Sequence, residues 1–341
     1  MLNHLTGFQR SLRVLEGLQE CTVNAYSQKV EEFLRWLQGN DISSDDPTGL
    51  TRKEIESYLE WCFYRKNSNQ TRHTKLTALS KFFRYLKYEN IIKEDFTANI
   101  PRPKITKRLM QAFIKDEILR LFSQIDHTTE KGIRDICILI LAAFCGFRVS
   151  EVYNLNLGDI IDDGKNIDFN IIDSKQGGSR RVYLWKSPGV YIRQYYIIRI
   201  GQGARIHDPF LVSYKWRSAT GRRLTAGAIE ILIKKLALKA GIKRPAIKTH
   251  MLRAAHANSL QHVKGYGLPQ IMHRLGWKHM STAGEYLVER ERIHRTYNSL
   301  YEYWLEFNHI WKNKEENNAN NSDGSACASP GPLEQGVVIA K

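Results

Sequence analysis

Apolar residues in the first hundred positions recur with the period of an α-helix. They return at three- and four-residue steps in the stretches 26–37, 55–62 and 76–86, and polar residues separate one stretch from the next. Each stretch therefore has one apolar face, as a helix packed on a core does. The pattern predicts a small helical domain over residues 1–98.

Beyond residue 110 the pattern is mixed. Helical spacing runs from Met110 to about Phe122 and again from 133 to 155, and helices are predicted from 226 onward to about 311. Between them, β-forming residues flank the turn sequence KQGGS, which predicts an antiparallel hairpin and allows a third short strand. The expected fold class is mainly α with a small antiparallel β-sheet (α+β).

The segment between these two regions is basic and rich in proline. In IPRPKITKR two prolines exclude regular helix, and four cations fall within seven residues: Arg102, Lys104, Lys107 and Arg108. We interpret residues 99–109 as an interdomain linker that can follow a phosphate backbone while the domains sit on opposite sides of a duplex. The second domain is then expected over 110–311, and residues 312–341, poor in periodic apolar positions, are expected to form a disordered tail.

Composition favours a polyanionic partner. The 341 residues suffice for two domains, and 51 lysines and arginines against 35 aspartates and glutamates give a formal net charge of +16. No apolar stretch reaches the roughly 18 residues of a spanning helix, and the amino terminus lacks an apolar signal segment. We therefore expect nucleic acid rather than membrane as the partner, and a cytoplasmic location.

The cysteines suggest neither a metal site nor a disulfide framework. They are odd in number and have no paired metal-type spacing: Cys21, Cys62, Cys137, Cys145 and Cys327. We expect reduced thiols and no metal or other cofactor.

One predicted helix has a basic face. Arg72 and Lys75 lie one turn apart, and Lys81 and Arg84 repeat the arrangement further along. This face is a candidate for phosphate contacts, and an ordinary solvated surface explains it equally well.

Two cationic side chains in the second domain suit phosphate chemistry. Arg148 stands where an apolar helix turns into a new one, and Glu151 three residues on can hold the guanidinium toward an anion. Lys175 opens the tip of the hairpin, where it can protonate an alkoxide leaving group. A surface salt bridge and a solvated lysine are the alternatives.

Two further places carry groups for proton transfer or nucleophilic attack. His250 and Arg253 share one face of a helix, with His256 competing for the same role. Thr282 and Glu285 form a capping-box pattern, so a helix is expected to begin there with Tyr286 in its first turn. Structural packing is the alternative for His250 and for Tyr286.

Taken together and in this order, GFRVSEVYNLNLGDI, the hairpin lysine, HMLRAAHA and LGWKHMSTAGEYL resemble the motifs of the tyrosine recombinases, the family of phage integrases and Xer-type resolvases. The resemblance implies that Arg148 and Arg253 are the family's two arginines, and that Tyr286 is its nucleophile. It also implies that Lys175 is the family's hairpin lysine and His250 its first histidine. Trp277, nine residues before Tyr286, stands at the position where the family has a histidine or a tryptophan. The chain departs from the commonest pattern in having Trp277 and Ala254 where histidines are usual.

The resemblance also implies an architecture and a reaction. Residues 1–98 look like a SAM-like core-binding domain, and 110–311 like a catalytic domain, the two forming a C-shaped clamp on double-stranded DNA at a specific site. Tyrosine attack on a DNA phosphate would give a 3′-phosphotyrosyl bond without metal or ATP. His279, lying between Trp277 and the tyrosine, is expected to be a bystander.

The end of the expected catalytic domain carries an aromatic stripe at helical spacing, formed by Tyr297, Leu300, Tyr301, Trp304, Phe307 and Trp311. Such a helix must bury this face, either on its own domain or, as the resemblance implies, on a neighbouring protomer. The second arrangement would give a dimer on one site and a tetramer in the synapse. A type IB topoisomerase-like enzyme and an inert DNA-binding protein of the same fold remain the competing interpretations.

Overall fold

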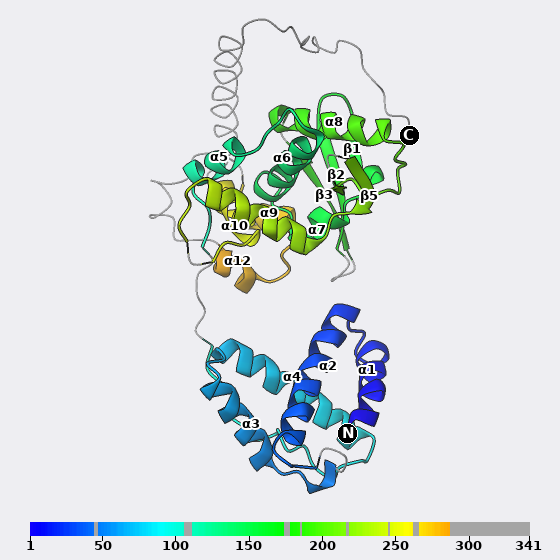
Figure 1. Ribbon diagram of the computed structural model, residues 1–341, viewed down its shortest axis with the longest axis vertical. Coiled ribbons are helices and arrows are strands. Elements are labelled where there is room, and N and C mark those ends of the chain that lie inside the picture. Colours follow the sequence, from blue (N-terminus) through cyan, green and yellow to red (C-terminus); the bar gives the residue numbers. More distant parts are fainter. Residues whose placement is uncertain are drawn as a thin grey trace, which may run out of the picture. The chain divides into compact units, whose positions relative to one another are not determined.

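The computed structural model describes residues 1–43, 47–105, 111–173, 178–184, 186–215, 218–244, 246–261 and 266–286. The chain divides into two compact units, Met1–Lys107 and Arg108–Lys341 (Figure 1). The division falls inside the basic, proline-containing segment IPRPKITKR. Each unit has its own hydrophobic core.

The first unit is a bundle of helices. After a short 3-10 turn at Leu2–His4, its helices are α1 (Leu5–Val14), α2 (Glu20–Gln38), α3 (Arg52–Tyr64) and α4 (Asn69–Tyr88), with another 3-10 turn at Pro47–Gly49. Helix α2 packs on α1, α3 and α4. The polar breaks supply the caps: Thr51 and Glu54 form a capping box on α3, and Ser68 accepts from the amide of Thr71 on α4.

The hairpin predicted in the second unit is present, together with the third strand. Strands β1 (Ile160–Asp162), β2 (Ile167–Asp173) and β3 (Gly178–Leu184) form an antiparallel sheet in the order β1-β2-β3. A second antiparallel pair, β4 (Val212–Lys215) and β5 (Ser218–Arg223), was not predicted. Apolar and polar residues do not alternate in either segment over enough positions to predict a strand.

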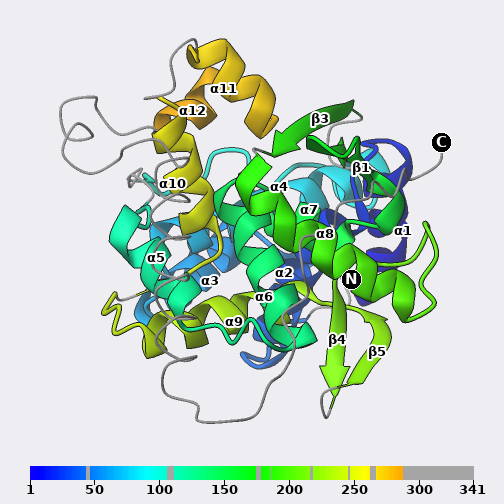
Figure 2. The ribbon, with the colours of Figure 1, turned by 90° about the horizontal axis from the view of Figure 1, so that it is seen from above.

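The described part of the second unit also contains eight α-helices. They are α5 (Lys115–Ser123), α6 (Glu130–Ala143), α7 (Val149–Asn154), α8 (Lys186–Gly201), α9 (Ala226–Lys239), α10 (His250–Leu260), α11 (Leu268–Leu275) and α12 (Met280–Tyr286), with a 3-10 turn at Leu157–Asp159. Helix α6 lies between α8 and α10 and is buried from Gly132 to its end (Figure 2). The prediction of a mainly helical fold with a small antiparallel sheet is confirmed.

Two local predictions were incomplete or wrong. Helix α8 was missed because isoleucines and tyrosines occur all around it, so no helical period stands out. Helix α12 begins at Met280 rather than at Thr282, whose amide donates to the carbonyl of His279. Tyr286 therefore lies beyond the first turn of α12, and the expectation that it lies in a first turn was wrong.

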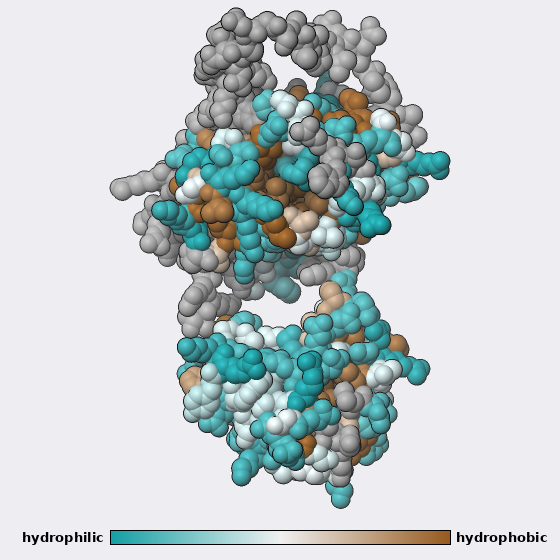
Figure 3. All heavy atoms as spheres, viewed as in Figure 1, coloured by the Kyte–Doolittle hydropathy of each residue, from teal (hydrophilic) through white to brown (hydrophobic). Residues whose placement is uncertain are grey.

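The visible surface of both units is mainly hydrophilic, with apolar patches on the second unit (Figure 3). Exposed apolar side chains of that unit include Val190, Ile197 and Ile200 on α8 and Leu238 on α9. Among the described residues, no helix combines the length and the apolar character that crossing a membrane requires. The helix expected to carry the aromatic stripe and the tail 312–341 lie outside the described residues.

Candidate active site

Glu151 is the centre of a cluster of arginines in the second unit. It stands in the first turn of α7, where its carboxylate accepts the main-chain amide of Arg148 at 2.8 Å and the Nη1 of the same residue at 2.8 Å. This is one half of a capping box, in which the carboxylate at the third helical position accepts the amide of the N-cap residue, here Arg148. The side chain of Glu151 is 7% exposed, whereas that of Arg148 is 24% exposed and reaches the surface.

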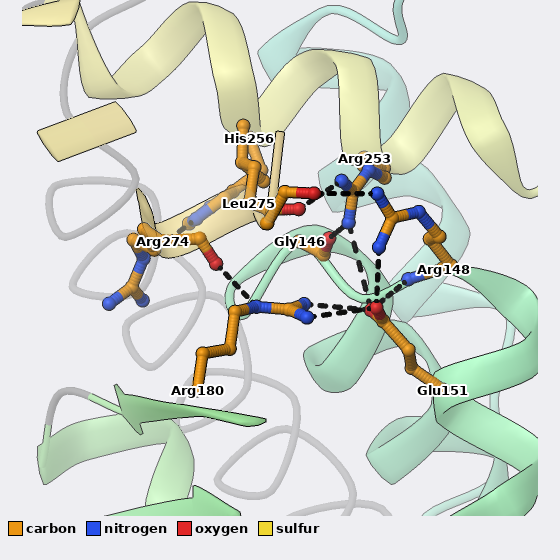
Figure 4. Close-up of polar contacts among 9 residues, drawn as sticks. Gly146, Arg148, Glu151, Arg180, Arg253, His256, Arg274 and Leu275 are labelled. Carbon is orange, nitrogen blue, oxygen red and sulfur yellow. Dashed lines mark hydrogen bonds and ion pairs between the residues drawn. The ribbon is translucent and has the colours of Figure 1, made fainter. Parts of the chain in front are cut away.

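Two more guanidinium groups converge on the same carboxylate (Figure 4). Arg180 of β3 donates from Nη1 to Oε1 at 3.0 Å and from Nη2 to Oε2 at 2.9 Å. Nη1 of Arg253, on α10, lies 3.7 Å from Oε2. Three cations from distant parts of the sequence thus share one anion.

The charge of Glu151 is stabilised by these neighbours. Burial alone would raise the pKa of this carboxyl group. The hydrogen-bonded guanidinium of Arg180, the charge of Arg253 and the amide of Arg148 oppose burial and lower the pKa to about 2. Since Glu151 is ionised at neutral pH, it offsets one of the three positive charges, and the cluster keeps an excess of positive charge suited to an anion.

The carboxyl end of α11 completes the cluster. Three successive carbonyl oxygens, those of Arg274, Leu275 and Gly276, accept from Arg180 Nε at 3.0 Å, Arg253 Nη2 at 2.5 Å and Arg148 Nη2 at 2.9 Å, respectively. The last carbonyls of a helix lack intrahelical partners and carry its negative partial charge, so cations are favoured there. The end of α11 therefore binds the three arginines that also surround Glu151.

Glycine is required at two turns of this cluster. Gly276 ends α11 with φ +62°, a left-handed conformation that favours glycine. Gly146 has φ +68°, and its carbonyl accepts from Arg253 Nη1 at 2.5 Å. A Cβ atom at Gly146 would lie 2.5 Å from His256 Cδ2 and 2.7 Å from Leu275 Cδ2, so a larger residue would push α10 and α11 away.

His250 and His256, both on α10, differ in environment. Burial, and then the charges of Arg253 and Arg148, lower the pKa of the half-buried His250, which favours its neutral form. His256 is fully buried, and its Nε2 accepts from Arg274 Nε at 3.1 Å. Burial and the charge of Arg274 lower the pKa of His256 well below its usual value, so His256 supports Arg274 from inside the core.

The segment that follows α11 covers Arg253. Trp277 is buried, and the guanidinium carbon of Arg253 lies 6.0 Å from the centre of its ring. The tryptophan packs in a small cluster with Ala254 and Ala283. His279 is exposed. Lys175 and the side chain of Tyr286 lie outside the described residues, while the backbone of Tyr286 belongs to α12.

The basic residues expected to contact DNA divide into two groups. Arg102 and Lys104 are exposed, and Arg102 Nη1 donates to the hydroxyl of Thr77 at 2.9 Å. Arg72 is half-buried, donates to Asn69 and lies over the ring of Phe63. Lys81 is half-buried and forms an ion pair with Glu16. Lys107 and Arg108 lie outside the described residues.

Lys75 requires a correction. It is 6% exposed, and its Nζ donates to Glu32 at 2.6 Å and to the sulfur of Cys62 at 3.5 Å. The interpretation of this lysine as part of an exposed basic face was wrong, because α2 packs against α4 there and supplies the carboxylate. Lys75 is therefore withdrawn from the candidate DNA contacts.

Arg180 and Arg274 were missed among the candidate residues. A signal for Arg180 was present, because it shares a strand face with Val182 and Leu184, and an arginine in an apolar row needs a buried partner. Arg274 carried no such local signal. Among the described residues, no group of three or more His, Cys, Asp or Glu side chains is placed to hold a metal ion.

Comparison with protein families accounts for both units. Residues 111–292 match the phage integrase family, and residues 5–93 match the phage integrase N-terminal SAM-like domain. The chain is 28% identical over 293 residues to a tyrosine recombinase of Pseudothermotoga lettingae. This alignment covers 85% of the chain and 95% of the relative. It is 26% identical to the tyrosine recombinase XerC of Bacillus pumilus, covering 86% of the chain and 94% of that protein.

Solved structures with the same fold include a lambda integrase dimer bound to a COC' core site, with a TM-score of 0.65 and 18% identity over 86% of the chain and 96% of that structure. The XerH site-specific recombinase in a post-cleavage complex with a palindromic difH substrate has a TM-score of 0.64 and 17% identity, covering 83% of the chain and 80% of that structure.

Proposed function

The chain belongs to the phage integrase family of tyrosine recombinases, and from this membership we propose that it cuts and rejoins double-stranded DNA at defined sites through Tyr286. The observation that carries the assignment of the site is the convergence of Arg148, Arg180 and Arg253 on one carboxylate. Such an excess of guanidinium charge suits a phosphate and the extra negative charge of its transition state.

In the proposed reaction the phenolic oxygen of Tyr286 attacks the scissile phosphorus. The bond from phosphorus to the bridging 5′-oxygen breaks, leaving a 3′-phosphotyrosyl ester and a free 5′-hydroxyl. That hydroxyl of one duplex then attacks the ester on the other and releases the tyrosine. Because the ester retains the energy of the original bond, the strand exchange needs no ATP.

Arg148 and Arg253 would bind the non-bridging phosphate oxygens. Two guanidinium groups can stabilise the charge of a pentacoordinate transition state without a metal ion. The two differ in access, because the side chain of Arg253 is 1% exposed. Arg148, at 24% exposed, is therefore the more accessible of the two to a phosphate.

Lys175 would protonate the leaving 5′-oxygen, His250 would assist proton transfer, and Trp277 would donate its indole N–H or support the pocket. A substrate with sulfur at the bridging 5′ position tests the lysine, because sulfur leaves without a proton. Lys175→Ala should slow cleavage of the ordinary phosphate by roughly 10²- to 10⁴-fold but leave the sulfur substrate nearly unaffected. Equal losses on both would show that Lys175 only binds DNA.

Domains and partners follow from the same proposal. The first unit and the linker would bind one side of the duplex and the catalytic unit the other, as a clamp. A dimer would bind one site, and a tetramer would form the synapse, with the helix before residue 311 docked on a neighbouring protomer. This role places the protein in the cytoplasm with the DNA.

Neither alternative is favoured. The SAM-like domain match and the near full-length similarity to Xer-type recombinases support strand exchange over supercoil relaxation by a type IB topoisomerase-like enzyme. The presence of both arginines in one charged cluster supports activity over an inert DNA-binding protein.

The experiment that tests the function is sequencing of the DNA that becomes covalently linked to the protein in cells. A site-specific recombinase yields reads that end at one position within a shared motif. Tyr286→Phe is the matched control, because it removes only the phenolic oxygen and should bind DNA without forming a denaturant-resistant adduct. Reads scattered without a motif would favour the topoisomerase, and no adduct from the unmodified protein would favour the inert binder.

A further inference from the structure

Arg180 donates to three acceptor atoms on two residues from one planar side chain. Its guanidinium donates to both oxygens of Glu151, at 3.0 and 2.9 Å, and its Nε donates to the carbonyl of Arg274 at 3.0 Å (Figure 4). The side chain is 6% exposed, so these bonds are shielded from water. A fork of donors in fixed geometry positions a carboxylate more strictly than a lysine can.

The first consequence concerns the direction of Glu151. A carboxylate offers about four acceptor positions, two on each oxygen. Arg180 donates once to each oxygen of Glu151, and so does Arg148. Arg180 thereby opposes Arg148 across the carboxylate and fixes its plane. Without Arg180, the plane of the carboxylate would no longer be fixed, and Arg148 and Arg253 would lose an oriented partner.

The second consequence concerns the segment that leads to the tyrosine. Arg180 binds the carbonyl of Arg274, and the next two carbonyls bind Arg253 and Arg148. The side chain of Arg274 supports this end from the other side, donating to His256 and to the carbonyl of Tyr183 on β3. Arg180 thus joins β3, which follows the hairpin tip with Lys175, to the end of α11, which precedes Trp277.

We propose that Arg180 is a positioning residue for DNA cleavage: it orients Glu151 and the carboxyl end of α11, and through them both arginines that bind the phosphate. This inference rests on the proposed function. It predicts that Arg180 affects the chemical step far more than DNA binding, since its side chain is buried.

Arg181 provides a matched control on the same strand. Its side chain is 58% exposed and forms an ion pair with Asp168 on the opposite face of the hairpin. Arg180→Gln and Arg181→Gln remove the same charge from adjacent positions. The duplex recovered from the covalent-adduct sequencing serves as the substrate, and single-turnover cleavage is measured at saturating protein alongside equilibrium binding.

We expect Arg180→Gln to slow cleavage on the order of 100-fold and to leave the affinity for the duplex within about threefold, because no DNA contact is lost. Arg181→Gln should cleave nearly normally. If Arg180→Gln does not fold, Arg180→Lys carries the test. A single ammonium cannot hold two carboxylate oxygens and a carbonyl in one plane, so this variant should bind DNA and cleave at least about tenfold more slowly.

Two readouts separate positioning from a general loss of stability. In the Glu151→Gln background, Arg180→Gln should slow cleavage by no more than about threefold further, because both residues act through one contact. In Arg180→Gln alone, the pKa of Glu151 rises, so cleavage should fall more steeply than that of the unmodified protein as the pH is lowered from 7 to 5. Protonation of His250 affects both proteins, so the difference between the two profiles reports Glu151.

Additive losses in the double variant, an unchanged pH profile, or equal cleavage by Arg180→Gln and Arg181→Gln would each overturn the role of Arg180. Failure of the proposed function looks different, because the unmodified protein itself would then form no adduct with any duplex.

Discussion

Each unit buries a cation next to a carboxylate, and the two sites differ in their balance of positive and negative charge. In the first unit Lys75 meets Glu32 at 2.6 Å, one cation for one anion. In the second unit Arg148, Arg180 and Arg253 share Glu151. Both places also set an aromatic ring near the cation, Tyr58 at 5.6 Å from Lys75 Nζ and Trp277 at 6.0 Å from the guanidinium carbon of Arg253.

The difference teaches that burial and ion pairing do not by themselves identify a site for an anion. The pair in the first unit is balanced and joins α2 to α4, so it has no charge left for a ligand. The cluster in the second unit keeps two positive charges in excess of its one carboxylate, and Arg148 reaches the surface. Buried like charges are costly, and a bound phosphate would relieve that cost.

The largest expected effect is on cleavage. Arg148→Ala should slow single-turnover cleavage by roughly 10²- to 10³-fold, because it removes a donor to the charge of the transition state. Lys75→Met, which removes a cation from the balanced pair, should cleave within about threefold of the unmodified protein. A comparable loss in both variants would break the distinction between the two regions.

The acid stability of the protein should depend on Glu151. Its pKa is lowered to about 2 in the folded state, below the value of about 4.3 in an unfolded chain. The stability it contributes is therefore present above pH 4.3, amounts to about 3 kcal/mol, and is lost as the pH falls toward 2. Urea unfolding between pH 5 and 2.5 measures this, and Glu151→Gln should lack that part of the decline. An identical pH dependence in Glu151→Gln would mean that Glu151 is not held ionised by the arginines.

The aromatic neighbours sharpen the comparison on a smaller scale. Trp277→Ala should slow cleavage by about tenfold, since it removes both packing and a possible hydrogen bond at the phosphate. Trp277→His should retain much of the activity, because imidazole can donate the same bond. His279→Ala and Tyr58→Leu should cleave normally. A nearly inactive His279→Ala beside a normal Trp277→Ala would reverse the assignment.

The balanced pair should matter for local stability. Lys75→Met should lower the protection of α4 amides from hydrogen exchange by about 1 to 2 kcal/mol. This is less than breaking a fully buried pair, because the side chain of Glu32 is 38% exposed and can be hydrated. Combining Lys75→Met with Glu32→Gln should restore most of the loss. If the double variant is less stable than either single one, the loss in the single variants does not come from the partner that is left unpaired.

The smallest effect is expected at the linker. Arg102→Ala or Lys104→Ala should each reduce the slope of log affinity against log salt by about 0.9, the amount expected for one phosphate contact. Lys75→Met should leave the slope unchanged, because its buried ammonium releases no counterion from DNA. A salt slope unaffected by both linker variants would exclude them from the DNA contacts.

Much of the fold was predictable from local pattern. The helical period of 26–37 and 76–86 and the KQGGS turn between β-forming segments led to α2, α4 and the β2–β3 hairpin. Helix α8 escaped because it is apolar on all sides, so its sequence has no preferred period. The burial of Lys75 was not predicted, because an alternation of basic and apolar residues does not reveal which turn of a helix a second helix covers.

The sequence by itself determined which chemical groups are available: two arginines, a hairpin lysine, a histidine and a tyrosine, in motifs that are short and local. Only the tertiary structure decided which cations meet which partners. Lys75, a candidate DNA contact by sequence, is buried in an ion pair with Glu32. Arg180, which was not a candidate, forms an ion pair with Glu151. The physical reason is that a charge interaction depends on distance and burial in space, and the carbonyls of Arg274, Leu275 and Gly276 meet three arginines only where the end of α11 packs against α7, α10 and β3.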